Sequence, residues 1–294
     1  MIDNPLIETG LPIALMIIMA GMGLTLTVAD FRRVFTFPRA MLVGTAAQIA
    51  LIPLLAFGLV ELLGPSPAIA VGLVIIAACP GGTTSNVFTF LAGGNVALSI
   101  VLTVIASLVT ILTIPLFANI ALDLYANTDA DAPVRLPLVD TVVQLAVIVV
   151  IPVALGLFVR ARFEEVAAWG ERFVSVFGLV VLGAIIAAIV FQTRDQMWTL
   201  LSQAGPSAVA LNVGGITLGF LSGYLGGISR RDALTIAIEV GIKNGTIGLM
   251  VTLSLLNDAE MAVPSAVYGV LMFAFGGLLA VYGRRTRGRD EAGA

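Results

Sequence analysis

Cys79-Pro80-Gly81-Gly82-Thr83-Thr84-Ser85-Asn86 is the stretch of this sequence that decides the fold. It lies inside a long apolar segment. There, proline removes a backbone donor and clashes with the preceding helical turn, and paired glycines loosen the helix further. An interrupted helix at membrane depth is tolerated only where the break is buried in protein or lines a cavity. The hydroxyl and amide side chains after the break therefore predict a polar site inside an apolar molecule.

A second apolar segment, Ile236-Ala237-Ile238-Glu239-Val240-Gly241-Ile242-Lys243-Asn244-Gly245, carries a matching irregularity. Its Lys243 is the only lysine of the chain. A charge at the bilayer centre costs roughly 2.5–3.5 kcal/mol, and such groups usually mark transport, proton-relay or ion-coupling sites. Because positions i and i+4 share a helical face, we expect Glu239 and Lys243 to neutralise each other. The alternative is a structural salt bridge that braces a broken helix.

The composition is that of an integral membrane protein built from helices. The chain is 59% hydrophobic and 11% charged, whereas soluble domains are about a quarter charged. Apolar stretches of about 20 residues recur, as membrane helices require. The absence of His and the single Cys79 exclude a zinc or haem site. No nucleophile is paired with a base, so we do not expect an enzyme. We also expect no cofactor and no nucleic-acid partner.

Charge distribution predicts how the chain crosses the bilayer. We predict nine apolar spans, at residues 11–29, 40–62, 68–91, 95–122, 137–159, 173–192, 206–226, 232–256 and 262–283. Because basic residues gather in cytoplasmic loops, the N-terminus lies outside and the C-terminus in the cytoplasm, in the cell inner membrane. The cytoplasmic basic residues are then Arg32, Arg33, Arg39, Arg160, Arg162, Arg172, Arg230, Arg231, Arg284, Arg285, Arg287 and Arg289. The outside loop at 123–133 is acidic, with Asp123, Asp129 and Asp131.

Two interrupted spans in matching halves indicate an inverted-repeat secondary transporter with its site at the midplane. Spans 1–4 and 6–9 form the repeats, and the fifth span connects them. In the seventh span, Gly219 and Gly223 predict close helix packing inside the protein.

Oxygen-bearing side chains gather around the two breaks. Sodium is a hard cation that prefers oxygen ligands, so we expect a sodium cage there. A helix beginning near Ser85 also points its positive N-terminus at the site, which suits an anionic substrate. Taken alone, Ser99 and Thr103 fit back-bonding hydroxyls equally well, and Gln48 fits an interhelical hydrogen bond. The candidate ligands are Gln48, Thr83, Thr84, Ser85, Asn86, Ser99, Thr103 and Glu239.

The first break, continuing through Gly94-Asn95-Val96-Ala97-Leu98-Ser99, closely resembles the signature of the bile acid:sodium symporter family. Glu239-Val240-Gly241-Ile242-Lys243-Asn244 looks like that family's second signature. The resemblance implies an all-α membrane protein of nine transmembrane helices, with inverted repeats and two crossing broken helices. Residues 1–294 would form one transporter domain, divided into a core (spans at 40–122 and 206–283) and a panel (spans at 11–29 and 137–192).

The resemblance also implies two sodium sites. Ser85, Asn86, Ser99, Thr103 and Glu239 match the first, and Gln48, Glu239 and position 243 match the second. Family members commonly carry Gln at position 243, and the ammonium of Lys243 would occupy the place of the second sodium. Met272 and Phe273 replace polar residues that many members carry in the last span, which favours a small acid over a bile acid.

The sequence therefore predicts a secondary active transporter in the lipid bilayer. We expect sodium-coupled symport of a small organic anion by alternating access, with Na⁺ as the only metal and Lys243 replacing the second sodium. Thr83, Thr84 and Asn244 would face the substrate. The alternatives are a proton-coupled organic anion transporter, a cation/proton antiporter of related fold, and a non-transporting ligand receptor.

Overall fold

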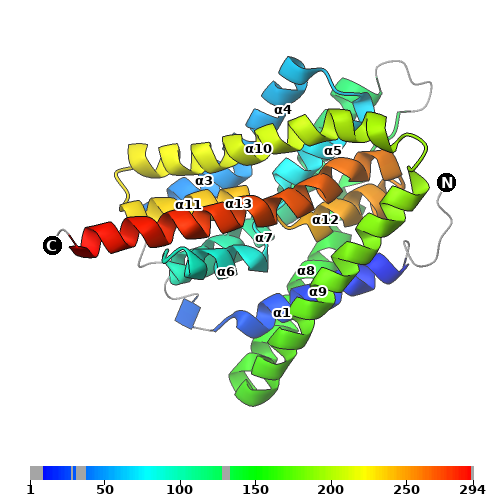
Figure 1. Ribbon diagram of the computed structural model, residues 1–294. Helices are drawn as coiled ribbons and strands as arrows, with labels where there is room; N and C mark the ends of the chain where they lie inside the picture. Colours follow the sequence, from blue (N-terminus) through cyan, green and yellow to red (C-terminus); the bar gives the residue numbers. More distant parts are fainter. Residues whose placement is uncertain (1–8, 28, 31–37, 128–132, 293–294) are drawn as a thin grey trace.

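The computed structural model describes residues 9–27, 29–30, 38–127 and 133–292, and helices make up most of this part of the chain (Figure 1). Four residues used above for topology, Arg32, Arg33, Asp129 and Asp131, lie outside the described residues, as do the side chains of Arg287 and Arg289.

Six helical segments of the described chain are long and apolar enough to cross a membrane. The expectation of an all-helical membrane protein is thereby confirmed. Two of the segments end or continue in a π-helical turn, at Ala47–Leu51 and Leu122–Ala126. The six are α3 to α4 (Pro38–Ala46 and Ile52–Leu63), α7 (Val96–Ala121), α8 (Leu138–Arg162), α9 (Glu164–Gln192), α10 (Met197–Leu225) and α13 (Ala259–Ala292).

The other apolar helices are shorter, and two pairs of them are the halves of interrupted segments. α1 covers Leu11–Thr25. α5 (Pro67–Ala78) stops before Pro80, and the chain resumes as α6 (Thr83–Leu91). α11 (Arg230–Gly241) stops before Lys243 and resumes as α12 (Gly245–Met250), followed by the π-helical turn Val251–Leu255. Both breaks therefore lie where the sequence predicts them.

Small residues bring the helix backbones close together. A Cβ at Gly23 of α1 would lie 2.2 Å from the Val153 carbonyl oxygen of α8, so only glycine permits this approach. Gly219 of α10 would likewise place a Cβ 2.5 Å from Ala237 Cα of α11. The close packing predicted from this glycine is confirmed. In Figure 1, α10 runs alongside α11 and α13, while α1, α8 and α9 lie together at the lower right.

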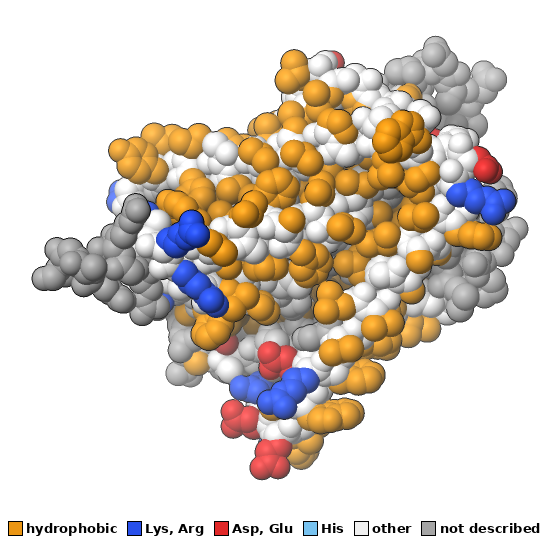
Figure 2. Space-filling model, viewed as in Figure 1, with side chains coloured by type: hydrophobic (Ala, Val, Ile, Leu, Met, Phe, Trp, Pro, Cys, Tyr) orange, Lys and Arg blue, Asp and Glu red, His pale blue; other side chains and the backbone are white. Residues whose placement is uncertain are grey.

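The molecular surface matches a bilayer. Hydrophobic side chains cover most of the face in Figure 2, and charged side chains gather at its ends. α9 leaves many of its apolar side chains exposed, including Phe173, Val176, Leu179 and Phe191. Exposed apolar surface of this extent is stable in lipid and not in water.

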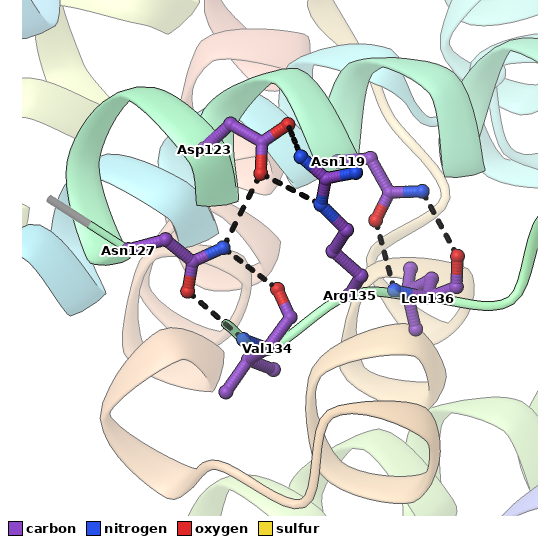
Figure 3. Close-up of polar contacts among 6 residues, drawn as sticks. All are labelled: Asn119, Asp123, Asn127, Val134, Arg135 and Leu136. Atoms are coloured by element: carbon purple, nitrogen blue, oxygen red, sulfur yellow. Dashed lines mark hydrogen bonds and ion pairs between the residues drawn. The ribbon is translucent and has the colours of Figure 1, made fainter. Parts of the chain in front are cut away.

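Polar contacts fasten the connection between α7 and α8 (Figure 3). The Arg135 guanidinium donates through Nε and Nη2 to the Asp123 carboxylate at 3.0 and 2.9 Å. Two asparagine side chains each exchange a pair of hydrogen bonds with a backbone residue across this connection: Asn119 with Leu136, and Asn127 with Val134. These contacts fix the start of α8 relative to the end of α7.

Candidate functional site

The two helix breaks meet as a short antiparallel bridge. Gly81 of the first break pairs with Lys243 of the second. On either side of this pair, Gly82 N donates to the Ile242 carbonyl at 3.3 Å, and Asn244 N donates to the Pro80 carbonyl at 2.8 Å. The unwound segments thus satisfy each other's backbone groups, which lipid could not do.

The end of α11 is completed by two residues that sequence reasoning missed. The Gly241 carbonyl accepts from Asn212 Nδ2 of α10 at 3.0 Å and from the Tyr268 hydroxyl of α13 at 2.8 Å. Helix-end carbonyls have no partner within their own helix, so these side chains stabilise the break. The sequence offered one signal of this contact, because Asn212 is an asparagine in the middle of an apolar helix.

Glu239 is the centre of a hydroxyl cage. Its carboxylate is fully buried and accepts hydrogen bonds from Ser85 Oγ at 2.6 Å, Ser99 Oγ at 2.9 Å and Thr103 Oγ1 at 2.5 Å. These groups come from α6, α7 and α11, so the cage forms only when the broken helices cross. The structure therefore brings together four of the five residues matched to the first sodium site.

The cage hydroxyls have more acceptors than protons. Ser85 Oγ lies 2.7 Å from the Gly82 carbonyl as well as against Glu239, and Thr103 Oγ1 lies 3.0 Å from the Ser99 carbonyl. Each hydroxyl carries one proton and two lone pairs. If the protons turn to the carbonyls, the hydroxyl lone pairs and the carboxylate all face a cation. This donor set fits a hard monovalent ion such as sodium.

A single carboxylate also limits the charge that the cage can hold. Within the part of the chain that the structure describes, no three His, Cys, Asp or Glu residues cluster as metal ligands. The two positive charges of a divalent cation would exceed the single negative charge of Glu239. Unbalanced charge is costly at a buried site.

Because Gly81 has no side chain, there is room beside it for the Glu239 carboxylate. A Cβ at Gly81 would lie 2.1 Å from Glu239 Oε1 and 2.8 Å from its Cδ, far inside van der Waals contact. The glycine of the first break therefore permits the carboxylate of the second to enter the cage, and this is a further residue that motif reading alone did not place.

Lys243 does not form the expected pair with Glu239. α11 ends at Gly241, and Ile242 is extended with φ −112° and ψ 103°, so the i,i+4 relation of a helix fails. The fully buried ammonium donates to the Cys79 carbonyl at 3.0 Å. The ion pairs of the described residues do not include one with Glu239. The two side chains thus form no direct ion pair, and the lysine instead joins the two breaks.

The remaining predicted residues surround the crossing in different ways. Gln48 Oε1 accepts from Gly81 N at 2.8 Å, while its Nε2 is buried without a hydrogen-bond partner among the described residues. Asn86 Oδ1 is also a buried atom without such a partner, so it has lone pairs to offer.

The three residues expected to face the substrate begin the second half of each broken helix. Asn244 Oδ1 caps α12 by accepting from Ile247 N at 3.3 Å. Thr83 and Thr84 begin α6 and are half-buried.

An aromatic contact lies between α6 and α13. Phe273 meets Phe88 edge-on, with ring centroids 6.2 Å apart, and the neighbouring Met272 is buried. Met272 and Phe273 occupy the positions where the resemblance leads one to expect polar residues.

Comparison with known proteins identifies the family of this chain. The family model described as "Sodium Bile acid symporter family" matches residues 12–200, which is more than half of the chain. The chain belongs to the Sodium Bile acid symporter family. The family and its relatives are transporters, so the prediction of a transporter and not an enzyme is confirmed.

Members of the Sodium Bile acid symporter family match along most of this chain. An "uncharacterized sodium-dependent transporter YocS" of Bacillus subtilis is 35% identical over 98% of this chain and 87% of its own length. A "probable sodium/metabolite cotransporter BASS1, chloroplastic" of Arabidopsis thaliana is 30% identical, and the chain spans 66% of it. The human "ileal sodium/bile acid cotransporter" is 28% identical over 81% of this chain and 67% of its own length. These relatives support a sodium-coupled transporter.

Proposed function

We propose that this protein is a secondary active transporter that couples the movement of a small organic anion to sodium by alternating access. The observation that carries the proposal is the cage in which three hydroxyls from α6 and α7 meet the buried Glu239 carboxylate of α11. Because this cage exists only while the two broken helices cross, a cation bound there stabilises one arrangement of those helices. Such differential binding is what couples an ion to a conformational change.

The first sodium is proposed to bind Ser85, Asn86, Ser99, Thr103 and Glu239. The unpartnered Oδ1 of Asn86 supports its place in this set, since a buried acceptor without a donor is costly unless a ligand satisfies it. Asn86 follows Ser85 in the first turn of α6.

Lys243 is proposed to stand in for a second sodium. Its ammonium donates to the Cys79 carbonyl at the C-terminal end of α5, where a helix carries partial negative charge that favours a cation. A Na⁺ would satisfy such a carbonyl in the same way. Gln48, the other residue matched to the second site, binds the neighbouring Gly81 N. With the place already filled by a cation, one sodium would accompany each substrate.

The substrate is proposed to be a small carboxylic acid, bound beside the crossing by Thr83, Thr84 and Asn244. The N-terminus of α6 begins at Thr83 and contributes partial positive charge. The Phe88–Phe273 contact places apolar rings between α6 and α13, which favours a short acid with few polar groups.

Nine spans are proposed to form the transporter. The six long helical segments, α1, and the interrupted pairs α5–α6 and α11–α12 together account for nine crossings. The first four and last four would be inverted repeats. α1, α8 and α9 contact one another, which supports a panel against which the remaining helices move. The N-terminus would lie outside, and the C-terminus in the cytoplasm, of the cell inner membrane.

A thermal-shift screen of organic acids, run in NaCl and in KCl, tests the proposal. Sodium alone should raise the unfolding temperature, and one class of small acids should raise it further in NaCl only. Uptake of that acid into proteoliposomes under a sodium gradient should follow. Uptake driven by a pH gradient without sodium, sodium flux without any organic solute, or ligand binding without uptake would each contradict the proposal. These outcomes favour the proton-coupled transporter, the antiporter and the receptor, respectively.

A further inference from the structure

A cavity of about 220 Å³ lies at the end of the molecule where α10 finishes and α11 begins. The side chains of Phe220, Arg230, Arg231, Leu234, Tyr282 and Thr286 line it. The apolar segments of α10 and α13 that can cross a membrane end at Leu225 and Thr286. The cavity is therefore at the level of the lipid headgroups.

Two arginines near the cavity hold charge that carboxylates do not balance. Arg231 Nη2 donates to the Gly94 carbonyl at 3.1 Å, and Arg284 Nε donates to the Leu91 carbonyl at 2.9 Å. The ion pairs of the described residues include neither side chain. The acid nearest in sequence, Asp232, accepts from Asn95 and Ser229 and does not line the cavity. Among the described side chains at this end, positive charges therefore outnumber negative ones.

Aromatic rings hold a third guanidinium in place. Arg230 Cζ lies 5.9 Å from the centre of the Tyr282 ring, and its Nη2 donates to the Tyr282 hydroxyl at 3.3 Å. Tyr282 in turn meets Phe220 edge-on, with centroids 6.0 Å apart. This guanidinium is therefore held in one position at the cavity, with little rotamer freedom left to lose.

We propose that this cavity binds the phosphate headgroup of an anionic phospholipid. The 12-residue helix α11 begins at Arg230, so its positive N-terminal end adds to the field of the arginines. The cavity is smaller than a typical drug-sized site, but it is large enough for a phosphate and the glycerol beside it. The site is separate from the helix crossing.

Apolar surface beside the cavity favours a lipid over free phosphate. Tyr224 and Leu225, at the end of α10, are about four-fifths exposed. In Figure 2, basic side chains at this end of the molecule lie directly beside hydrophobic ones. A lipid satisfies both surfaces at once, with its phosphate on the arginines and its acyl chains along α10. A soluble phosphate would use only the first.

The test compares phosphatidylglycerol with phosphatidylcholine on the full-length protein in detergent, by lipid titration of the unfolding temperature and by native mass spectrometry. The wild-type protein should prefer phosphatidylglycerol. Because each basic residue near an anionic surface contributes roughly a fivefold gain in affinity, R230Q/R231Q should lose about 25-fold. The control R160Q/R162Q removes the same charge from the end of α8 and should keep the preference.

A second variant separates lost binding from lost folding. T286W keeps every arginine and fills the cavity, so it should also lose the preference while it remains monodisperse and keeps its unfolding temperature in phosphatidylcholine. Equal binding of the two lipids by the wild-type protein would overturn the proposal, as would an equal loss in R160Q/R162Q. Protection by inorganic phosphate alone, at the same phosphate concentration, would assign the cavity to a soluble anion and overturn the lipid assignment.

Discussion

Replacing Gly81 with alanine tests whether the cage around Glu239 is the sodium site. The added Cβ would lie 2.1 Å from Glu239 Oε1, whereas ordinary contact begins near 3.4 Å. The two atoms must therefore separate by about 1.3 Å. Both lie at the crossing of the broken helices, where the backbone is fixed by the bridge between Gly81 and Lys243. The carboxylate is thus the part that moves.

The expected loss follows from the contacts that this movement stretches. Glu239 accepts three hydrogen bonds, from Ser85, Ser99 and Thr103. A hydrogen bond to a charged group contributes roughly 1.5–3 kcal/mol. Losing the equivalent of one such contact to the ion corresponds to roughly 10- to 150-fold weaker sodium binding.

Gly82→Ala is the matched control. Its Cβ would meet Thr84 Oγ1 at 3.3 Å and the Lys243 carbonyl at 3.4 Å, and Gly82 has φ −96° and ψ 163°, which alanine adopts freely. Sodium affinity should change by about threefold or less. The measurement is the unfolding temperature of each purified variant during titration with NaCl at constant ionic strength, with KCl as reference. If Gly81→Ala binds sodium as tightly as Gly82→Ala, the carboxylate is not a ligand and the reasoning fails.

Three further substitutions test separate parts of the account. Glu239→Gln keeps the shape of the side chain but removes its charge, so the difference in unfolding temperature between NaCl and KCl should vanish; a retained difference would move the sodium site elsewhere. Asn86→Ala should weaken sodium binding about tenfold in the same titration, because its Oδ1 has no other partner among the described residues; a large fall in stability in KCl would instead indicate a structural role. Arg135→Gln breaks an ion pair whose side chains are 63% and 41% exposed, so chemical denaturation should show a loss of about 1 kcal/mol or less, with sodium affinity unchanged.

Local sequence signals were sufficient to place the helix breaks. Pro80 and the glycines beside it cannot continue α5, and Gly241 and Gly245 flank the second interruption. Long apolar runs likewise predict the long helices, because any membrane-spanning segment must satisfy its backbone internally. The oxygen-bearing residues around the breaks predict a cage, and the family resemblance assigned Ser85, Ser99, Thr103 and Glu239 to one site. The structure brings these four together. Their roles in binding sodium stay predictions.

The contact that the Lys243 side chain makes could not be predicted from sequence. The i,i+4 rule assumes a continuous helix, but α11 ends at Gly241, whose carbonyl is held by Asn212 and Tyr268, 29 and 27 residues away in the chain. Contacts of this range determine where a helix stops and leave no periodic pattern in the sequence. The same applies to Gln48, whose partner Gly81 N is 33 residues away.

The most direct test of the account is the sodium dependence of uptake. The anion found in the thermal-shift screen would be measured in proteoliposomes containing either the wild-type protein or Lys243→Gln. Since Lys243 already fills the second cation place, the wild-type protein should show a Hill coefficient of about one for sodium, rising toward about two in Lys243→Gln. A wild-type coefficient near two, or a coefficient that the substitution leaves unchanged, would contradict the claim that the protein supplies its own second cation.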